Sequence, residues 1–85
     1  MDQKKQYPYE AHFPLVGGKK DVLCAEHERD LLELIRMYVR QRSNDCTPEE
    51  RAQLLLALET GRWPIIAEKY EAANPHLPPP YLRIK

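Results

Sequence analysis

The strongest pattern in the chain is a pair of leucine-rich segments with apolar residues at helical spacing. Between residues 25 and 42, apolar side chains recur every three or four positions and fall in one arc of a helical projection, opposite a polar face. Between residues 47 and 60, leucine and alanine occupy most of the circumference, so we expect this helix to be covered on more than one side. The turn-forming residues 43–45 separate the two segments, which predicts an antiparallel helical hairpin.

The start of the second helix carries the most specific local signal. Thr47-Pro48-Glu49-Glu50 places a hydroxyl at the N-cap, a proline at the first helical position and a glutamate at the third. Thr47 and Glu50 can then accept from each other's backbone N–H groups, which is the capping-box arrangement. Gly61 supplies the C-terminal stop signal. The sequence therefore predicts a helix that begins at residue 47 or 48 and ends near residue 60.

The N-terminal part of the chain follows a different period. From Tyr7 to Leu15 every second residue is apolar, which suits an extended strand with one apolar face. The glycine pair at positions 17 and 18 predicts a turn, after which a short return strand can follow. Pro8 and Pro14 each remove a ladder donor, so an extended arm laid across the helices is the alternative to a short β-hairpin.

The C-terminal part predicts one more short helix and a proline-rich tail. The helix is expected from about Pro64 and must end before Pro75, because the residue preceding a proline avoids helical geometry. Three consecutive prolines at positions 78–80 favour the polyproline II conformation. Apolar residues follow them, so we expect the tail to pack on the body of the protein or on a partner.

These elements together predict a mainly α fold in one domain, with an antiparallel helical hairpin, a short third helix and extended arms at both ends. We divide it into an extended arm or short β-hairpin over residues 1–24, a helical core over residues 25–74 and a proline-rich C-terminal tail over residues 75–85. A chain of 85 residues has a small core. We therefore expect self-association or a partner to contribute to its stability.

The charge balance disfavours nucleic acids and membranes as partners. Lysine and arginine total 13, as do aspartate and glutamate, so the chain has no net field to attract polyanions. The first residues are polar and no apolar run approaches membrane-spanning length, which predicts a cytoplasmic protein with no membrane partner. Cys24 and Cys46 flank the first predicted helix, roughly 30 Å apart at helical rise, so free thiols are expected.

Metal binding and catalysis are both weakly indicated. Cys24 and His27 have a spacing seen in zinc sites, and Cys46, His12 and His76 could add ligands, but only one close pair exists. A metal-stabilised module is therefore our third choice, and we predict no metal and no cofactor. Nor does a nucleophile stand beside a base with an oxyanion-binding turn, so we predict no catalytic residues and no enzyme.

A DNA-binding role is the alternative function. Residues 61–70 resemble the first helix of a helix-turn-helix unit, which implies a DNA-binding transcriptional regulator. The recognition helix would have to form across prolines 78–80, which cannot propagate a helix. Arg83 and Lys85 alone would then contact phosphates or bases, so nucleic acid is the less favoured partner.

The tail also contains a short sequence that matches a known ligand motif. Pro78-Pro79-Pro80-Tyr81 has the proline-proline-x-tyrosine pattern recognised by WW domains, in which a preformed polyproline helix binds an aromatic groove. The alternative is a tail folded back over the aromatic residues of the third helix. The sequence leaves both open.

The residue types point most strongly to protein contacts. Tyrosine, tryptophan and arginine are the side chains that most often anchor protein interfaces, and this chain carries five tyrosines and an arginine stripe on its first helix. We therefore predict a small non-catalytic adaptor, inhibitor or regulatory protein that binds another protein or a second copy of itself. The candidate protein-binding residues are Tyr7, Tyr9, Phe13, Arg36, Tyr38, Arg40, Trp63, Tyr70 and Tyr81.

Overall fold

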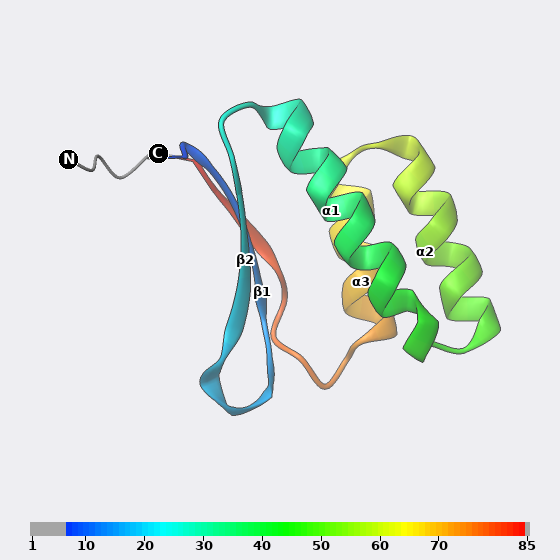
Figure 1. Ribbon diagram of the computed structural model, residues 1–85. Helices are drawn as coiled ribbons and strands as arrows, with labels where there is room; N and C mark the ends of the chain where they lie inside the picture. The colour runs from blue at the N-terminus through cyan, green and yellow to red at the C-terminus, as the bar shows by residue number, and fades with distance from the viewer. Residues whose placement is uncertain (1–6, 85) are drawn as a thin grey trace.

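The computed structural model describes residues 7–84, so residues 1–6 and Lys85 of the two predicted arms lie outside the described part. Its elements in chain order are β1 (Tyr9–Pro14), the 3-10 turn η1 (Val16–Gly18), β2 (Lys20–Ala25), α1 (Glu28–Arg42), the 3-10 turn η2 (Ser43–Asp45), α2 (Pro48–Thr60), α3 (Trp63–Ala73) and β3 (Tyr81–Ile84). The strands form one antiparallel sheet, and the helices lie on one side of it, with α2 farthest from the strands (Figure 1).

The prediction of a mainly α fold with extended arms is wrong, because the two ends of the chain form a three-stranded sheet in the order β2-β1-β3. Of the two interpretations of the N-terminal segment, the β-hairpin is the one that forms. The two prolines that argued against a strand stand at its ends: Pro8 precedes β1, and Pro14 is its last residue. At these positions a missing N–H costs the ladder little.

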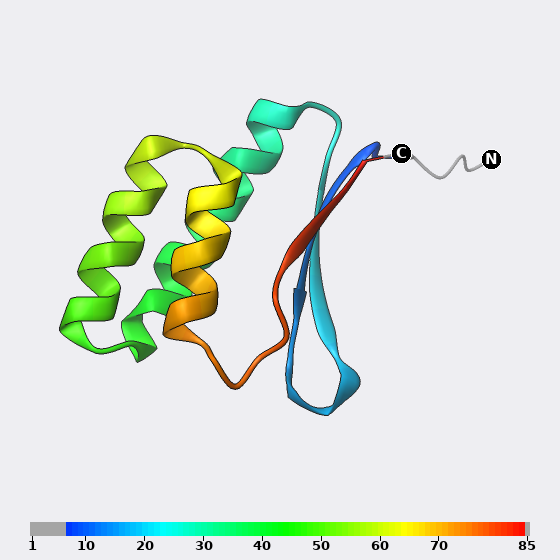
Figure 2. The same cartoon turned by 180° about the vertical axis from the view of Figure 1, so that it is seen from behind.

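The central strand β1 pairs with both of its neighbours. Its register with β2 runs from Tyr9 opposite Ala25 to Pro14 opposite Lys20. Its register with β3 runs from Tyr9 opposite Ile84 to His12 opposite Tyr81. The strand nearest the C-terminus therefore lies against the strand nearest the N-terminus, as the view from behind shows (Figure 2).

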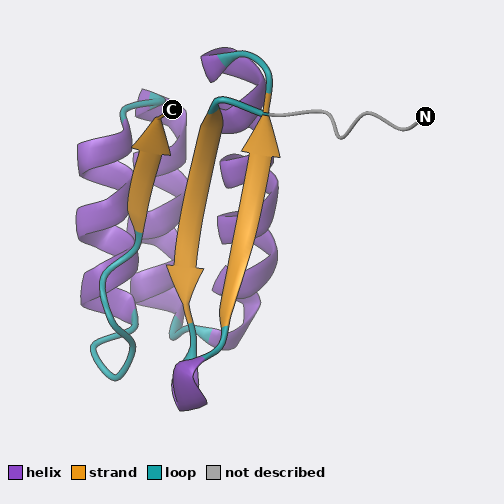
Figure 3. Ribbon diagram, turned by 90° about the vertical axis from the view of Figure 1, so that its left-hand side faces the viewer, coloured by secondary structure: helices purple, strands orange, loops and turns teal. Residues whose placement is uncertain are grey.

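The helices cover only one face of the sheet, and the strands stand in front of them when the molecule is seen from the sheet side (Figure 3). On the covered face, Ala11 and Phe13 of β1 have no exposed surface. The Phe13 ring lies 4.3 Å from that of Tyr38, 5.3 Å from that of Tyr70 and 6.0 Å from that of Trp63, measured between centroids. Phe13 thus connects the sheet to both α1 and α3.

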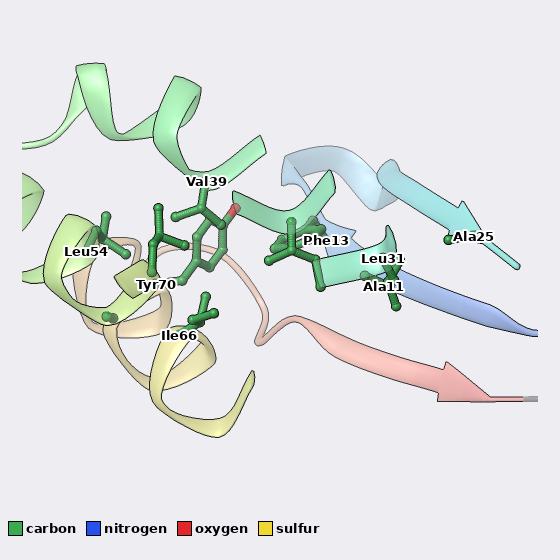
Figure 4. Packing of buried hydrophobic residues seen from close by; sticks show 11 residues of the cluster. Ala11, Phe13, Ala25, Leu31, Val39, Leu54, Ile66 and Tyr70 are labelled. Atoms are coloured by element: carbon green, nitrogen blue, oxygen red, sulfur yellow. The ribbon is translucent and has the colours of Figure 1, made fainter. Parts of the chain in front are cut away.

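Residues of every layer close the core around this aromatic group (Figure 4). The buried apolar side chains on the helices are Leu31, Ile35, Val39, Leu54, Ala57, Leu58, Ile66 and Tyr70. The three buried residues of α1 recur at helical spacing, which confirms the inward arc predicted for that helix. No helix within residues 7–84 is both long and apolar enough to cross a lipid bilayer.

The predicted boundaries of α2 are confirmed, but its coverage is incomplete. The Glu50 N–H donates to Thr47 Oγ1 at 3.2 Å and the Thr47 N–H donates to Glu50 Oε1 at 3.1 Å, which completes the capping box. Gly61 ends the helix in the left-handed conformation, with φ of 68°. Leu56 stays 60% exposed, so the outer side of α2 presents apolar surface to solvent.

Candidate functional site

The outer edge of β3 has no neighbouring strand within residues 7–84, because β3 pairs only with β1. An edge strand presents unpaired backbone N–H and C=O groups that can pair with another chain. Natural edges are often protected by charge, and the other edge strand of this sheet, β2, carries both Lys20 and Asp21. β3 carries a single charge, on Arg83. It is the less protected edge of the sheet.

A cavity of about 320 Å³ lies between the β1–β3 part of the sheet and the first turns of α1 and α3. We call it the β3 recess. Its apolar lining consists mainly of Tyr9, Leu31, Leu32, Trp63, Leu82 and Ile84. Its charged lining residues are Glu28 and Arg62, which have opposite signs.

Two of the residues that line the β3 recess are alternate residues of the edge strand. Side chains at alternate positions of a strand point to the same face, so Leu82 and Ile84 both lie on the helix side of β3. Ile84 is 64% exposed even though it lines the cavity. The recess therefore opens beside a strand whose outer edge pairs with no other strand among residues 7–84.

The other face of the sheet is organised by a stacked ring pair. The ring of Tyr81 on β3 lies 4.7 Å from that of His12 on β1, at an interplanar angle of 7°. His12 Nε2 lies 3.0 Å from Glu10 Oε1, at hydrogen-bond distance. His12 is consequently only 4% exposed, although it lies on the face that the helices do not cover. The stack orders β3 against β1 and so contributes to the position of the edge.

A second hollow, of about 560 Å³, lies between α1 and α2. We call it the α1–α2 groove. It is lined by the apolar side chains of Leu55 and Leu58 and by the charged side chains of Arg36, Arg40, Arg51 and Glu59. Arginine and leucine thus meet on one concave surface.

A polar contact between α1 and the hairpin is structural. The Tyr38 hydroxyl donates a hydrogen bond to Asp21 Oδ2 at 2.8 Å, and the Arg42 guanidinium carbon lies 5.4 Å from the Tyr38 ring centroid. Burial, followed by the hydrogen bond to Asp21, raises the pKa of Tyr38 well above its usual range. The phenol therefore stays protonated near neutral pH and serves as a donor in packing.

The structure places five of the predicted binding residues on these surfaces. Tyr9 and Trp63 line the β3 recess, and Arg36 and Arg40 line the α1–α2 groove. Tyr81 lies on β3 itself, 45% exposed and stacked on His12 rather than extended as a free tail. Four of these five residues thus line the two hollows, and Tyr81 faces the opposite side of the sheet.

The other four predicted residues lie elsewhere. Phe13 and Tyr70 are 0% and 1% exposed in the core, where a partner cannot reach them. Tyr38 is half-buried between α1 and the hairpin, and Tyr7 is half-buried just before β1. The sequence identified these aromatic side chains as anchors, but it did not show that most of them anchor the protein's own layers.

The residues that complete both surfaces were missed. Leu82 and Ile84 were assigned to a tail, although the alternation in Tyr81-Leu82-Arg83-Ile84 has the period of a strand. Arg51 reaches the α1–α2 groove only because of how α2 lies against α1. That orientation has no local signature in the sequence.

The candidate metal ligands lie on separate elements: Cys24 is on β2, His27 is the N-cap of α1, and Cys46 follows η2. In the described part of the chain, no three His, Cys, Asp or Glu side chains are grouped to hold a metal ion. Both cysteines are free thiols.

The recognition helix that a DNA-binding role requires would follow α3. Residues 74–80 form no helix there and lead into β3.

Comparison of the chain with protein-family models, with curated proteins and with solved structures finds no match. The chemistry of the two surfaces must therefore indicate what they bind. The β3 recess lies beside a strand edge that has no strand partner in the described part of the chain, and the α1–α2 groove joins guanidinium groups to leucine side chains. Neither lining includes a nucleophilic thiol or hydroxyl beside a histidine base.

Proposed function

We propose that this protein is a small non-catalytic binding domain that pairs an extended segment of another protein with the outer edge of β3. The observation that carries the proposal is that Leu82 and Ile84, alternate residues of an edge strand, line an apolar cavity. In strand addition, backbone hydrogen bonds supply affinity, and pockets for alternate side chains supply selectivity. The β3 edge and the β3 recess together offer both.

The recess defines the chemistry of the segment. A strand paired with β3 directs every second side chain toward the helix side, where the recess opens. The cavity of about 320 Å³ is lined mainly by aliphatic and aromatic groups, so it favours a bulky apolar side chain. Glu28 and Arg62 balance each other in charge, which favours an uncharged side chain at that position.

A partner protein fits this edge better than a second copy of the chain does. The β3 strand of a second copy carries Leu82 and Ile84, which already line that copy's own recess. An extended segment of another protein has its alternate apolar side chains free to enter the recess. We propose that the protein acts in the cytoplasm, where free thiols such as Cys24 and Cys46 persist.

Peptide selection followed by NMR would test the proposal. Peptides selected from a random displayed library on the folded protein should share a bulky apolar residue in an extended segment. Their binding should slow hydrogen exchange of outward-facing backbone amides of residues 81–84, because those amides gain acceptors. Ile84→Lys should abolish binding, whereas Leu56→Lys should not; the two side chains are 64% and 60% exposed.

Three outcomes would overturn the proposal. The first is that the selected peptides bind Ile84→Lys as tightly as the unchanged protein, and the second is that no amide of β3 gains protection on binding. The third is a concentration-dependent dimer in light scattering that Ile84→Lys abolishes, which would make a second copy the occupant of the edge.

A further inference from the structure

The α1–α2 groove is a second concave surface, formed by other elements than the β3 recess. α2 packs chiefly on α3, and its side toward α1 leaves a hollow of about 560 Å³. Leu58 in this hollow is 2% exposed and Leu55 is half-buried, so both belong to its floor. An apolar floor between two antiparallel helices matches the shape of a third helix laid along them.

The charges around this floor are mainly positive. Arg36 and Arg40 come from α1 and Arg51 from α2, while Glu59 is the one carboxylate in the lining. Arg36 Nη1 forms an ion pair with Glu33 Oε1 at 3.1 Å. Within residues 7–84, neither Arg40 nor Arg51 has a carboxylate within ion-pair distance. Two guanidinium groups, one from each helix, are therefore left to pair with acidic groups of a ligand.

We propose that the α1–α2 groove binds an acidic amphipathic helix of a partner protein. The apolar stripe of that helix covers Leu55, which lies beside the already buried Leu58, and carboxylates beside the stripe pair with Arg40 and Arg51. Guanidinium groups bind carboxylates in a planar geometry with two hydrogen bonds, which suits them to this role. Charge complementarity and the leucine floor thus specify the same ligand.

A nucleic acid fits the groove less well than an acidic helix. Phosphates could pair with the arginines, but a phosphate backbone has no apolar stripe to cover the leucine floor. The whole chain carries no net charge, so long-range attraction of a polyanion is absent.

The proposal is independent of strand addition at β3, because its residues belong to α1 and α2 alone. Ile84→Lys should therefore leave helix binding intact. Loss of peptide binding at β3 in this variant should leave binding of the acidic helix at the groove unchanged. The two proposals can therefore fail independently.

NMR titration of the isotope-labelled protein with four synthetic probes would test the inference. The probes are an acidic amphipathic helix, a scrambled peptide of the same composition without an apolar stripe, a lysine-substituted version and a single-stranded DNA oligonucleotide. Only the first should shift amide signals around Arg40, Arg51 and Leu55, and added salt should weaken its binding. Arg40→Gln and Arg51→Gln should each lower affinity roughly two- to fivefold. Arg29→Gln, which removes the same charge elsewhere on α1, should not.

The same titration contains the results that would overturn the inference. Equal binding of the scrambled peptide would show that charge alone is recognised, and tighter binding of the oligonucleotide would identify a nucleic-acid surface. Shifts confined to β3, or unchanged affinity in both arginine variants, would place the helix outside the groove.

Discussion

The Tyr38 hydroxyl donates a 2.8 Å hydrogen bond to Asp21 Oδ2, which ties the middle of α1 to strand β2. The two residues are 17 positions apart in sequence and come from the helical layer and the sheet layer. The Tyr38 ring also packs on Phe13, at 4.3 Å between centroids. One side chain therefore contributes both a polar and an aromatic contact to the joint between the two layers.

Removal of the Tyr38 hydroxyl should destabilise the protein. Tyr38→Phe keeps the ring against Phe13 and leaves the partly buried Asp21 carboxylate without its donor. We expect the free energy of unfolding to fall by about 1–2 kcal/mol, as measured by urea denaturation. Asp21→Asn, which can still accept from the phenol, should cost less. An unchanged urea midpoint in Tyr38→Phe would contradict this role.

The same change at Tyr70 should have the opposite outcome. The Tyr70 side chain is buried, and its hydroxyl makes no hydrogen bond of good geometry among residues 7–84, although Tyr38 and Arg42 lie near it. Loss of an unsatisfied buried hydroxyl removes a desolvation cost and leaves the ring contact with Phe13 intact. Tyr70→Phe should therefore unfold at the same temperature as the unchanged protein or a higher one. A drop as large as that of Tyr38→Phe would show that this hydroxyl is bonded.

The stability of the protein should fall in alkali. Burial raises the pKa values of Tyr38 and Tyr70 above the ordinary tyrosine value of 10.0. Below that pH, the folded and unfolded chains both keep the phenol protons, and the contribution to stability is complete. Above it the unfolded chain loses them first, so the free energy of unfolding falls as pH rises toward the folded-state pKa values.

Urea denaturation at a series of pH values would measure this effect, with tyrosinate absorbance as a second signal. The urea midpoint should begin to fall above about pH 10. The fall should be less steep in Tyr38→Phe, which lacks one of the two phenols. A midpoint that stays constant after all five tyrosines have ionised would mean that the buried phenols ionise without cost to folding.

Gly61 should tolerate few substitutions. Its φ of 68° lies in the left-handed region, and a β-carbon there would stand 3.2 Å from Arg36 Nη2. Gly61→Ala should cost about 1–2 kcal/mol, chiefly from the backbone, because the arginine side chain can move aside. Asn adopts left-handed geometry more readily, so Gly61→Asn should cost less. If Gly61→Ala and Gly61→Asn lose equal stability in thermal unfolding, the cost comes from the contact of the new β-carbon with Arg36 and not from the backbone conformation.

Local features of the fold could be predicted from the sequence, including the β1–β2 hairpin as one of two alternatives, whereas the pairing of β3 with β1 could not. The capping box of Thr47 and Glu50 lies within four residues, and the inward face of α1 follows from spacing alone. The pairing of Tyr9 with Ile84 joins positions at opposite ends of the chain, and no local pattern specifies it. Pro8 and Pro14 weighed against a strand in the N-terminal segment, although Pro8 precedes β1 and Pro14 ends it, where a missing N–H costs the ladder little.

The candidate surfaces were predictable only in part, because they too depend on contacts between residues far apart in the sequence. The exposed arginines of α1 follow from helical periodicity, and Arg36 and Arg40 do line the α1–α2 groove. The groove also requires Arg51 from α2, and the recess requires Leu82 and Ile84 from β3. Their positions depend on how whole elements pack, which a single sequence does not encode in neighbouring residues.

The pairing of β3 with the central strand has a consequence for biosynthesis. Until residues 81–84 have left the ribosome, β1 lacks one of its two neighbours and Tyr81 cannot cover His12. The helices can form earlier, since their contacts are local and form quickly. Completion of the sheet must wait for the last strand, so a nascent chain stalled before this point would remain open along its central strand and exposed to aberrant pairing.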